Sequence, residues 1–175
     1  SLLYEADKES IVTIAVYSSS GSLLAAEPVA NQKMEPDVTR QEWFQAAIEG
    51  IENPHFSLPH VQNLFDADSY RRVISLSRSV DLNTGDEPET GVLLLDFSSS
   101  DIEQMMQQLS GPLEGQYYYL CDSDGNLIAH PQKAQIMEGL LSEDTSDAAK
   151  HPDGILEQTV NGTKRTLIIH SISYT

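Results

Sequence analysis

A hairpin pattern that occurs twice constrains the fold of this chain more than any other feature. In the second half, a β-rich run from Tyr117 to Cys121 enters the polar turn Asp122 to Gly125 and leaves it in an apolar run. The first half has the same layout around Gly21, in IVTIAVYSSSGSLLAAEP. Each glycine supplies the positive φ that such a turn needs. A unit repeated about 100 residues apart predicts two similar α+β modules in tandem.

The charge balance disfavours two classes of partner. The chain has 175 residues, with 10 Lys and Arg against 27 Asp and Glu, and a formal net charge of −17. Nucleic acid and anionic membrane surfaces are therefore not expected to bind it, because like charges repel. The longest aliphatic run, Val92 to Leu95, is far shorter than the roughly 20 residues of a membrane-spanning helix. The start at Ser1 without Met predicts a piece of a longer protein.

Periodic patterns predict the remaining elements of the first module. Residues 11–17 alternate between two faces, which predicts a strand packed on one side. Thr39 and Glu42 have capping-box spacing and predict a helix that ends at Gly50. Residues 51–69 have the composition of a long surface loop, and such loops are often binding loops or lids. Two strands are expected next, over 70–80 and 91–97, with a turn at 83–86 between them.

A second capping box marks the connection between the modules. Ser100 and Glu103 have its spacing, and they precede a helical pattern that Gly111-Pro112 ends. We interpret this helix as the connector. The modules are accordingly assigned to residues 1–110 and 111–175.

The second module is expected to repeat the order of the first. After its hairpin, the pattern predicts a helix over 132–142, an acidic loop over 142–154, and strands near 155–160 and 165–173. The sequence of the second module stops where a last strand would be expected. The second module is therefore expected to be truncated at its C-terminus.

This order of elements resembles the double Cache (PAS-like) extracytoplasmic sensor domain of bacterial receptors, and is most similar to those of receptor histidine kinases. The matching stretches are the RxxWF helix, the strands YRRVISLSRSV and TGVLLLDF, and the second hairpin DSDGNLIAHP. In that family, two transmembrane helices flank the sensor and a long N-terminal helix precedes the first hairpin. The resemblance implies an α+β fold of two tandem modules, each an antiparallel sheet flanked by helices.

The resemblance also implies a ligand site in the first, membrane-distal module. In family members that bind amino acids, an Arg and a Trp on the helix hold the carboxylate, and an Asp on the later strand holds the ammonium. Arg40, Trp43 and Asp96 match these positions. Phe44 stands where a Tyr is usual, and Tyr70 matches a second aromatic residue. The sequence departs from the family because Arg40 lies three residues before Trp43 instead of two.

The residues themselves support two interpretations of the helix. A guanidinium and an indole N–H can together bind a carboxylate, and Arg40 is expected to share the helix face of Trp43 and Phe44. The alternative is a surface Arg lying over a core Trp.

The two strands also carry polar residues with alternative roles. Arg78 and Asp96 lie in phase with apolar positions of their strands, which favours a buried opposite-charge pair. The alternative is that Asp96 faces the pocket and binds a ligand ammonium. Ser75 and Ser77, on the face opposite Arg78, either donate to a polar ligand such as a sugar or face water.

No pattern predicts catalysis, a metal or a cofactor. No Gly-x-Ser-x-Gly elbow is present, and no nucleophile has an assignable base. His55 and His60 share a loop with two aspartates, but the spacing fits no zinc pattern. The stretch 122–126 resembles the opening of a calcium loop, yet its twelfth position is Lys133, so a turn is expected.

We therefore expect a non-enzymatic sensor domain on the extracytoplasmic side of a bacterial membrane. A small molecule, meaning an amino acid, an organic acid or a sugar, would bind the first module under the 51–69 loop and shift the arrangement of the modules. The parent would carry flanking transmembrane helices, regulate a cytoplasmic kinase, and form a homodimer. The alternative is a module that reads a partner protein or dimerises without any small-molecule ligand.

Overall fold

The computed structural model describes residues 10–34, 37–50, 54–66, 70–82, 89–109, 115–160 and 162–172. The expected turn at 83–86 and the helix stop at Gly111-Pro112 lie outside the described residues. Contacts divide the chain into two compact units, Ser1–Ile102 and Glu103–Thr175, and each is taken by itself below.

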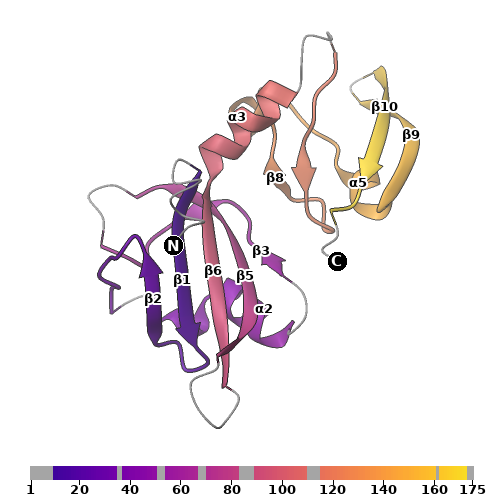
Figure 1. Ribbon diagram of the computed structural model, residues 1–175. Helices are drawn as coiled ribbons and strands as arrows, with labels where there is room; N and C mark the ends of the chain where they lie inside the picture. The colour runs from indigo at the N-terminus through magenta and orange to yellow at the C-terminus, as the bar shows by residue number, and fades with distance from the viewer. Residues whose placement is uncertain are drawn as a thin grey trace. The chain divides into compact units, whose positions relative to one another are not determined.

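The first unit is built on a six-stranded antiparallel sheet with α2 on one face (Figure 1). Its strands run in the order β2-β1-β6-β5-β3, and β4 also pairs directly with β5, at Arg72 and Val73. The strands predicted at 70–80 and 91–97 form the long central pair, β5 and β6. Their observed ends differ from the predicted ends by up to two residues, which is common at the ends of elements. The strands are β1 Ile11–Ser18, β2 Leu23–Glu27, β3 His55–Phe56, β4 His60–Val61, β5 Arg72–Leu82 and β6 Glu89–Ser98.

The helical segment of the first unit is broken in two, contrary to the capping-box prediction. A single 3-10 turn, η1 (Val38–Arg40), precedes α2 (Glu42–Glu49). Asp37 caps the 3-10 turn, because its carboxylate accepts from the backbone N–H and the hydroxyl of Thr39 at 2.9 and 2.7 Å. Gln41 is extended between the two elements, so α2 has no side-chain cap. Thr39 and Glu42 therefore do not form a capping box.

The register of the central strands decides which face meets α2. Ser75 on β5 and Thr13 on β1 both lie opposite Asp96 on β6. This face contributes the buried residues of β1 and most of those of β5, including three serines of β5. The core of the unit lies between this face and α2, and its buried members are Ala15, Tyr17, Val38, Trp43, Phe44, Ala47, Leu64, Phe65, Val92 and Leu94.

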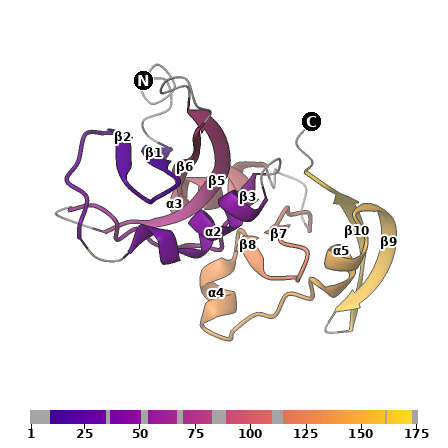
Figure 2. The ribbon, with the colours of Figure 1, turned by 90° about the horizontal axis from the view of Figure 1, so that it is seen from below.

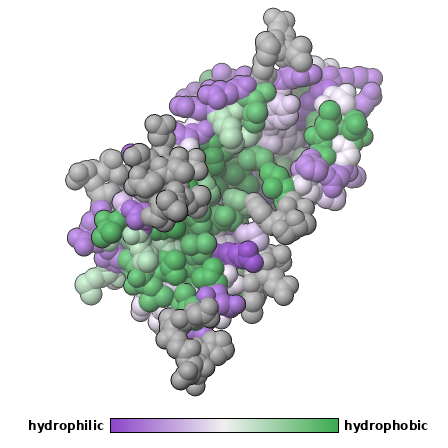
Figure 3. All heavy atoms as spheres, viewed as in Figure 1, coloured by the Kyte–Doolittle hydropathy of each residue, from purple (hydrophilic) through white to green (hydrophobic). Residues whose placement is uncertain are grey.

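The opposite face of the same sheet is apolar and only partly covered. Its half-buried side chains include three from β1, Val12, Ile14 and Val16, with Leu93 of β6 and Leu76 of β5. Figure 3 shows hydrophobic residues gathered over the sheet of this unit. Among the described residues, no helix is both long enough and apolar enough to cross a bilayer.

The second unit has two small antiparallel hairpins and short helices (Figures 1 and 2). The helix α3 begins at Ser99, where the hydroxyl of Ser98 accepts from the backbone N–H of Asp101. The cap is therefore Ser98 and not Ser100. The helix α3, Ser99–Leu109, contains the boundary between the two units, at Ile102. The further elements are β7 Leu120–Cys121, β8 Leu127–Ala129, α4 Lys133–Met137, α5 Ser146–Lys150, β9 Asp153–Val160 and β10 Thr163–His170.

The two predicted hairpins both form. Gly21 has φ 82° and Gly125 has φ 85°, in the left-handed region that the turns were expected to require. In the second hairpin, the carboxylate of Asp122 accepts from the backbone N–H groups of Asp124 and Asn126 at 2.9 and 2.8 Å. The segment is thus a turn, stabilised by its own first side chain.

The helix predicted over 132–142 is much shorter. It spans five residues, α4, and the chain then turns at Gly139, which has a positive φ. Neither end has a side-chain cap, and no residue of α4 is buried. Without an apolar face to bury, the pattern does not sustain further turns.

Candidate functional site

The carboxylate of Asp96 is the centre of the candidate site in the first unit. Asp96 is 0% exposed and accepts hydrogen bonds from the hydroxyl of Ser75 and from the side-chain amide of Gln62. Among the described residues, no Lys or Arg forms an ion pair with it. Burial raises the pKa of Asp96, while the hydrogen bonds from Ser75 and Gln62 and the nearby His60 oppose that rise. A buried carboxylate without a cationic partner is costly, and such sites are often functional.

The segment Ser57–Asp66 covers this carboxylate. Two backbone hydrogen bonds attach the segment to β5 and the residue before it. The N–H of Ser57 donates to the carbonyl of Ser75, and the N–H of Gln62 donates to the carbonyl of Arg71, both at 2.9 Å. The Nδ1 of His60 lies 3.2 Å from the hydroxyl of Ser57, and its Nε2 lies 3.4 Å from that of Ser75. The sequence predicted an irregular loop here, but its described part includes the two short strands β3 and β4.

Aromatic side chains of β1 and α2 pack together in the core of the first unit. The ring of Tyr17 lies 5.6 Å from that of Trp43, and the ring of Trp43 lies 5.8 Å from that of Phe44. The hydroxyl of Ser77 donates to the carbonyl of Trp43 at 2.7 Å, which fixes α2 on β5. Tyr17 is wholly buried, and its hydroxyl has no hydrogen-bond partner within the described part of the chain. Its pKa is raised by burial and by the charge of Asp96.

The structure brings five of the eight predicted site residues together. All five are buried in the layer between α2 and the sheet: Trp43 and Phe44 on α2, Ser75 and Ser77 on β5, and Asp96 on β6. This layer is closely filled by neighbouring core side chains.

The other three predicted site residues lie at the surface. The side chain of Arg40 is 85% exposed, and its Nε lies 3.6 Å from Oδ2 of Asp37. Gln41, in an extended conformation, separates Arg40 from the helix that carries Trp43. The expectation that Arg40 shares the face of the aromatic rings is therefore wrong. Tyr70 is 52% exposed and contacts Lys33, whose ammonium lies 4.3 Å from the ring centre.

Arg78 and Asp96 do not form the predicted buried pair. Arg78 lies opposite Leu93 on β6, whereas Asp96 lies opposite Ser75, so the two charges point to opposite faces of the sheet. Arg78 is exposed. Each residue is in phase with apolar neighbours on its own strand, but phase within a strand does not give the register between strands.

A hollow elsewhere in the unit is lined by residues with aliphatic side chains. It has a volume of about 380 Å³ and lies beside β2. Its lining is made by six aliphatic residues, Leu23, Leu24, Ala25, Ala26, Val29 and Ala30.

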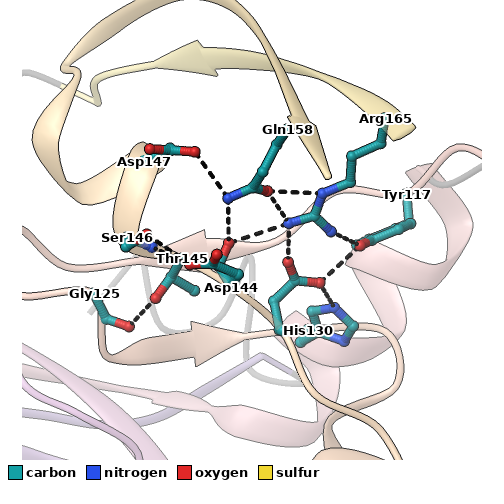
Figure 4. A network of polar contacts seen from close by, with 10 residues as sticks. Tyr117, Gly125, His130, Asp144, Thr145, Ser146, Asp147, Gln158 and Arg165 are labelled. Atoms are coloured by element: carbon teal, nitrogen blue, oxygen red, sulfur yellow. Dashed lines mark hydrogen bonds and ion pairs between the residues drawn. The ribbon is translucent and has the colours of Figure 1, made fainter. Parts of the chain in front are cut away.

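A second polar centre lies in the second unit, around the carboxylate of Glu143 (Figure 4). Its side chain is 2% exposed and contacts three partners. Arg165 Nη2 donates at 2.5 Å, the hydroxyl of Tyr117 donates at 2.7 Å, and Nε2 of His130 lies at 3.2 Å. Burial would raise the pKa of Glu143, but the hydrogen bonds from His130, Arg165 and Tyr117 lower it to about 2.

The network extends from Arg165 into the neighbouring hairpin. Arg165 Nε donates to the side-chain carbonyl of Gln158 at 2.9 Å, and Nη2 donates to the backbone carbonyl of Asp144 at 3.1 Å. Gln158 in turn donates to Asp147 at 3.0 Å. Each residue labelled in Figure 4 makes at least one polar contact within the protein, which is typical of a structural network.

Sequence reasoning missed the residues that complete both centres. Gln62 and His60 lie in a stretch without periodicity, so nothing predicted that they would face Asp96. Tyr17 was assigned to a strand face only. Glu143 lies in the segment 142–154, which was predicted as an acidic loop but contains the helix α5.

Solved structures with a similar fold are sensor domains. The ligand-binding domain of the amino acid chemoreceptor PctB from Pseudomonas aeruginosa, in complex with L-Gln, has a TM-score of 0.58 at 19% identity, covering 91% of this chain and 61% of that chain. That of the chemoreceptor CtaA from Pseudomonas fluorescens, in complex with L-leucine, has a TM-score of 0.58 at 20% identity, covering 93% and 64%. A domain of a sensory box/GGDEF family protein from Vibrio parahaemolyticus has a TM-score of 0.50 at 18% identity, covering 85% and 57%.

These comparisons establish the fold. No family model matches the sequence. No curated protein matches it either. The chain spans less than two thirds of the length of the two chemoreceptor domains named above. The predicted α+β class with antiparallel sheets is confirmed, and the fold is that of bacterial chemoreceptor ligand-binding domains.

Proposed function

We propose that the first unit senses a small molecule with a protonated amine, such as a free amino acid, and that Asp96 binds the ammonium group. The observation that supports this most is the burial of an Asp whose two oxygens are met by neutral donors only. An ammonium would supply the missing opposite charge in a water-poor site, where a charged hydrogen bond is strongest. The fold is shared with PctB and CtaA, whose structures hold L-Gln and L-leucine.

The remaining predicted residues have defined roles in this proposal. Trp43 and Phe44 form the apolar wall for the ligand side chain, and Ser75 and Ser77 line the polar floor. Arg40 forms an exposed ion pair with Asp37, which water weakens, so its guanidinium is available to a ligand carboxylate.

The surface residue Tyr70 is placed at the entrance in this proposal and contributes an aromatic edge, and its exposure is what such a role requires. Arg78 lies on the face of the sheet opposite Asp96 and therefore has no role in this proposal.

In the parent protein, the chain would form the extracytoplasmic part of a receptor, with a ligand-binding module over 1–110 and a membrane-proximal module over 111–175. Ligand would favour one arrangement of the modules and so regulate a cytoplasmic histidine kinase within a homodimer. The size of the response follows from the difference in ligand affinity between the two arrangements.

A thermal-shift screen of the 175-residue chain tests the ligand class. Each of the 20 amino acids, a set of organic acids and a set of sugars is added at increasing concentration. We expect one or more amino acids to raise Tm with the logarithm of concentration. Asp96→Asn should abolish the rise, and Arg40→Ala should abolish it for ligands with a carboxylate. No rise with any amine would contradict the proposal.

A second candidate function is partner recognition or dimerisation without a small molecule. The half-buried apolar residues of the open sheet face favour it, because such surfaces are typical of interfaces. A concentration-dependent dimer that Val16→Asp abolishes, together with no ligand in the screen, would support this candidate over the first.

A further inference from the structure

The side-chain amide of Gln62 occupies the place on Asp96 that the proposed function gives to a ligand ammonium. Its Nε2 donates to Oδ2 of Asp96, and its Oε1 accepts from the backbone N–H of Leu64 at 2.7 Å. Both ends of the amide thus have partners, which fixes its orientation. Gln62 is 9% exposed, so this contact is shielded from water.

The bond between Gln62 and Asp96 joins a carboxylate to a neutral donor. A neutral amide leaves the negative charge of Asp96 without a counter-ion, and burial raises the pKa of that carboxyl although the hydrogen bond from Gln62 lowers it. A protonated amine in the same place would form a charge-assisted hydrogen bond, which is about twice as strong as one between neutral groups. An ammonium would therefore form a stronger hydrogen bond with Asp96 than the amide does.

A second feature concerns the hydroxyl of Tyr17, which lies on the same face of the sheet as Asp96. The hydroxyl of Tyr17 is wholly buried and unpartnered within the described residues, and it is close enough to Asp96 for the carboxylate charge to contribute to its raised pKa. Leaving a buried hydroxyl without a hydrogen bond costs about 1–3 kcal/mol. A polar ligand at Asp96 that extends to this hydroxyl would supply the missing partner.

We propose that Gln62 is an internal competitor that holds the Asp96 site closed, and that ligand binds by displacing its amide while Tyr17 gains a hydrogen bond. This inference rests on the proposed function for its natural ligand. It adds that the affinity of the site is set by a residue of the covering segment. A site that is open for only a fraction of the time binds more weakly by that fraction, so removal of Gln62 raises the affinity.

The test uses methylammonium chloride, the smallest primary amine that presents an ammonium and a methyl group. Thermal unfolding of the 175-residue chain is followed with increasing methylammonium for the wild type, Gln62→Ala and Gln62→Ala/Asp96→Asn. Tetramethylammonium, which has no N–H donor, and sodium chloride are the matched controls. We expect methylammonium to raise the Tm of Gln62→Ala at a concentration at least tenfold lower than the one needed for the wild type. It should have no such effect on the double variant.

A second variant keeps the test decisive if the truncation to Ala prevents folding. Gln62→Asn retains an amide but is one methylene too short to reach Asp96, and it should respond to methylammonium as Gln62→Ala does. Tyr17→Phe in the Gln62→Asn background should weaken the response, since the ligand loses one partner. Equal responses of the wild type and the Gln62 variants, or a response that persists without the carboxylate, would overturn the proposal.

The outcome is separable from that of the ligand screen. If no amino acid binds the wild type but methylammonium binds Gln62→Ala through Asp96, the competitor role holds and the proposed ligand class fails. If an amino acid binds the wild type and Gln62→Ala leaves its Kd unchanged, the ligand class holds and the competitor role fails.

Discussion

Nη2 of Arg165 lies 2.5 Å from Oε1 of Glu143, and this contact joins the last hairpin of the second unit to a segment 22 residues earlier. The second unit buries few apolar side chains, with Ala129 and Leu167 among them. A small apolar core supplies limited stability. We therefore expect the polar network around Glu143 to contribute an unusually large part of the stability of this unit.

Arg165→Met should destabilise the second unit more than the loss of a surface charge would. The variant leaves Glu143 buried and without its cation, and breaking such a pair from one side costs about 3–5 kcal/mol. Chemical denaturation followed by circular dichroism measures the loss. Lys164→Met, a neighbouring position with an exposed side chain, is the matched control and should change stability by less than about 0.5 kcal/mol. Equal effects of the two variants would mean that the pair is dispensable.

The stability of the second unit should also depend on pH in the acid range. The pKa of Glu143 in the folded protein is about 2, below the ordinary value of about 4.3 for an unfolded Glu. Because the folded pKa is the lower one, the stabilisation is complete above about pH 4.3 and is lost as pH falls toward about 2. The difference in unfolding free energy between the wild type and Glu143→Gln should be largest at neutral pH and should shrink over this window. A constant difference would contradict the assignment.

Asp96→Asn should make the chain more stable while it removes ligand binding. The pKa of Asp96 is raised in the folded state, so ionisation at neutral pH opposes folding, and the cost declines as pH falls toward the unfolded pKa near 3.9. We expect a gain of about 0.5–2 kcal/mol at pH 7 that becomes smaller at pH 4. Thermal denaturation at the two pH values measures it. Asp81→Asn, an exposed Asp on β5, is the control and should have little effect.

The sequence predicted features that depend on local chemistry. Gly21 and Gly125 predicted the turns of the two hairpins, because a backbone position with positive φ strongly favours glycine. Strand alternation located β5 and β6 to within about two residues of their ends. These patterns repeat on a short period, so a single sequence is enough to detect them.

Contacts between distant segments were not predictable in the same way. The register of β5 against β6 separated Arg78 from Asp96, although each position looked right within its strand. Gln62 reaches Asp96 across 34 residues from a stretch with no period. Glu143 was expected in an acidic loop, and an acidic residue is rarely buried without partners that only the fold can bring to it. The site was therefore predictable as a set of residue types and only partly as a set of neighbours.

Ser77→Ala should loosen the attachment of α2 to the sheet. Ser77 is 0% exposed, and its hydroxyl donates to the carbonyl of Trp43 at 2.7 Å. Loss of one such bond costs about 0.5–1.5 kcal/mol, and the fluorescence of Trp43, the single Trp of the chain, should report the change. Ser19→Ala, at an exposed turn position, is the control and should leave both stability and emission unchanged. A Trp43 emission spectrum and stability equal to the wild type would contradict the role of Ser77.

Gly21→Ala should destabilise the first unit through two separable effects. The backbone has φ 82°, where an L side chain costs about 1–2 kcal/mol, and an added Cβ would lie 2.6 Å from Cγ2 of Thr39. Gly139→Ala isolates the first effect, because its φ is 72° and a Cβ there meets nothing within 4 Å.

Thr39→Ser isolates the second effect, since it removes the obstructing methyl group but keeps the hydroxyl that bonds to Asp37 at 2.7 Å. In the Thr39→Ser background, Gly21→Ala should therefore cost no more than Gly139→Ala does in the wild type. Equilibrium urea denaturation of the four variants measures the differences. If Gly21→Ala is equally destabilising with Thr and with Ser at position 39, the first hairpin does not pack against the 3-10 turn as the structure shows. The comparison thus tests whether the repeated turn, beyond reversing the chain, positions the segment that leads into α2.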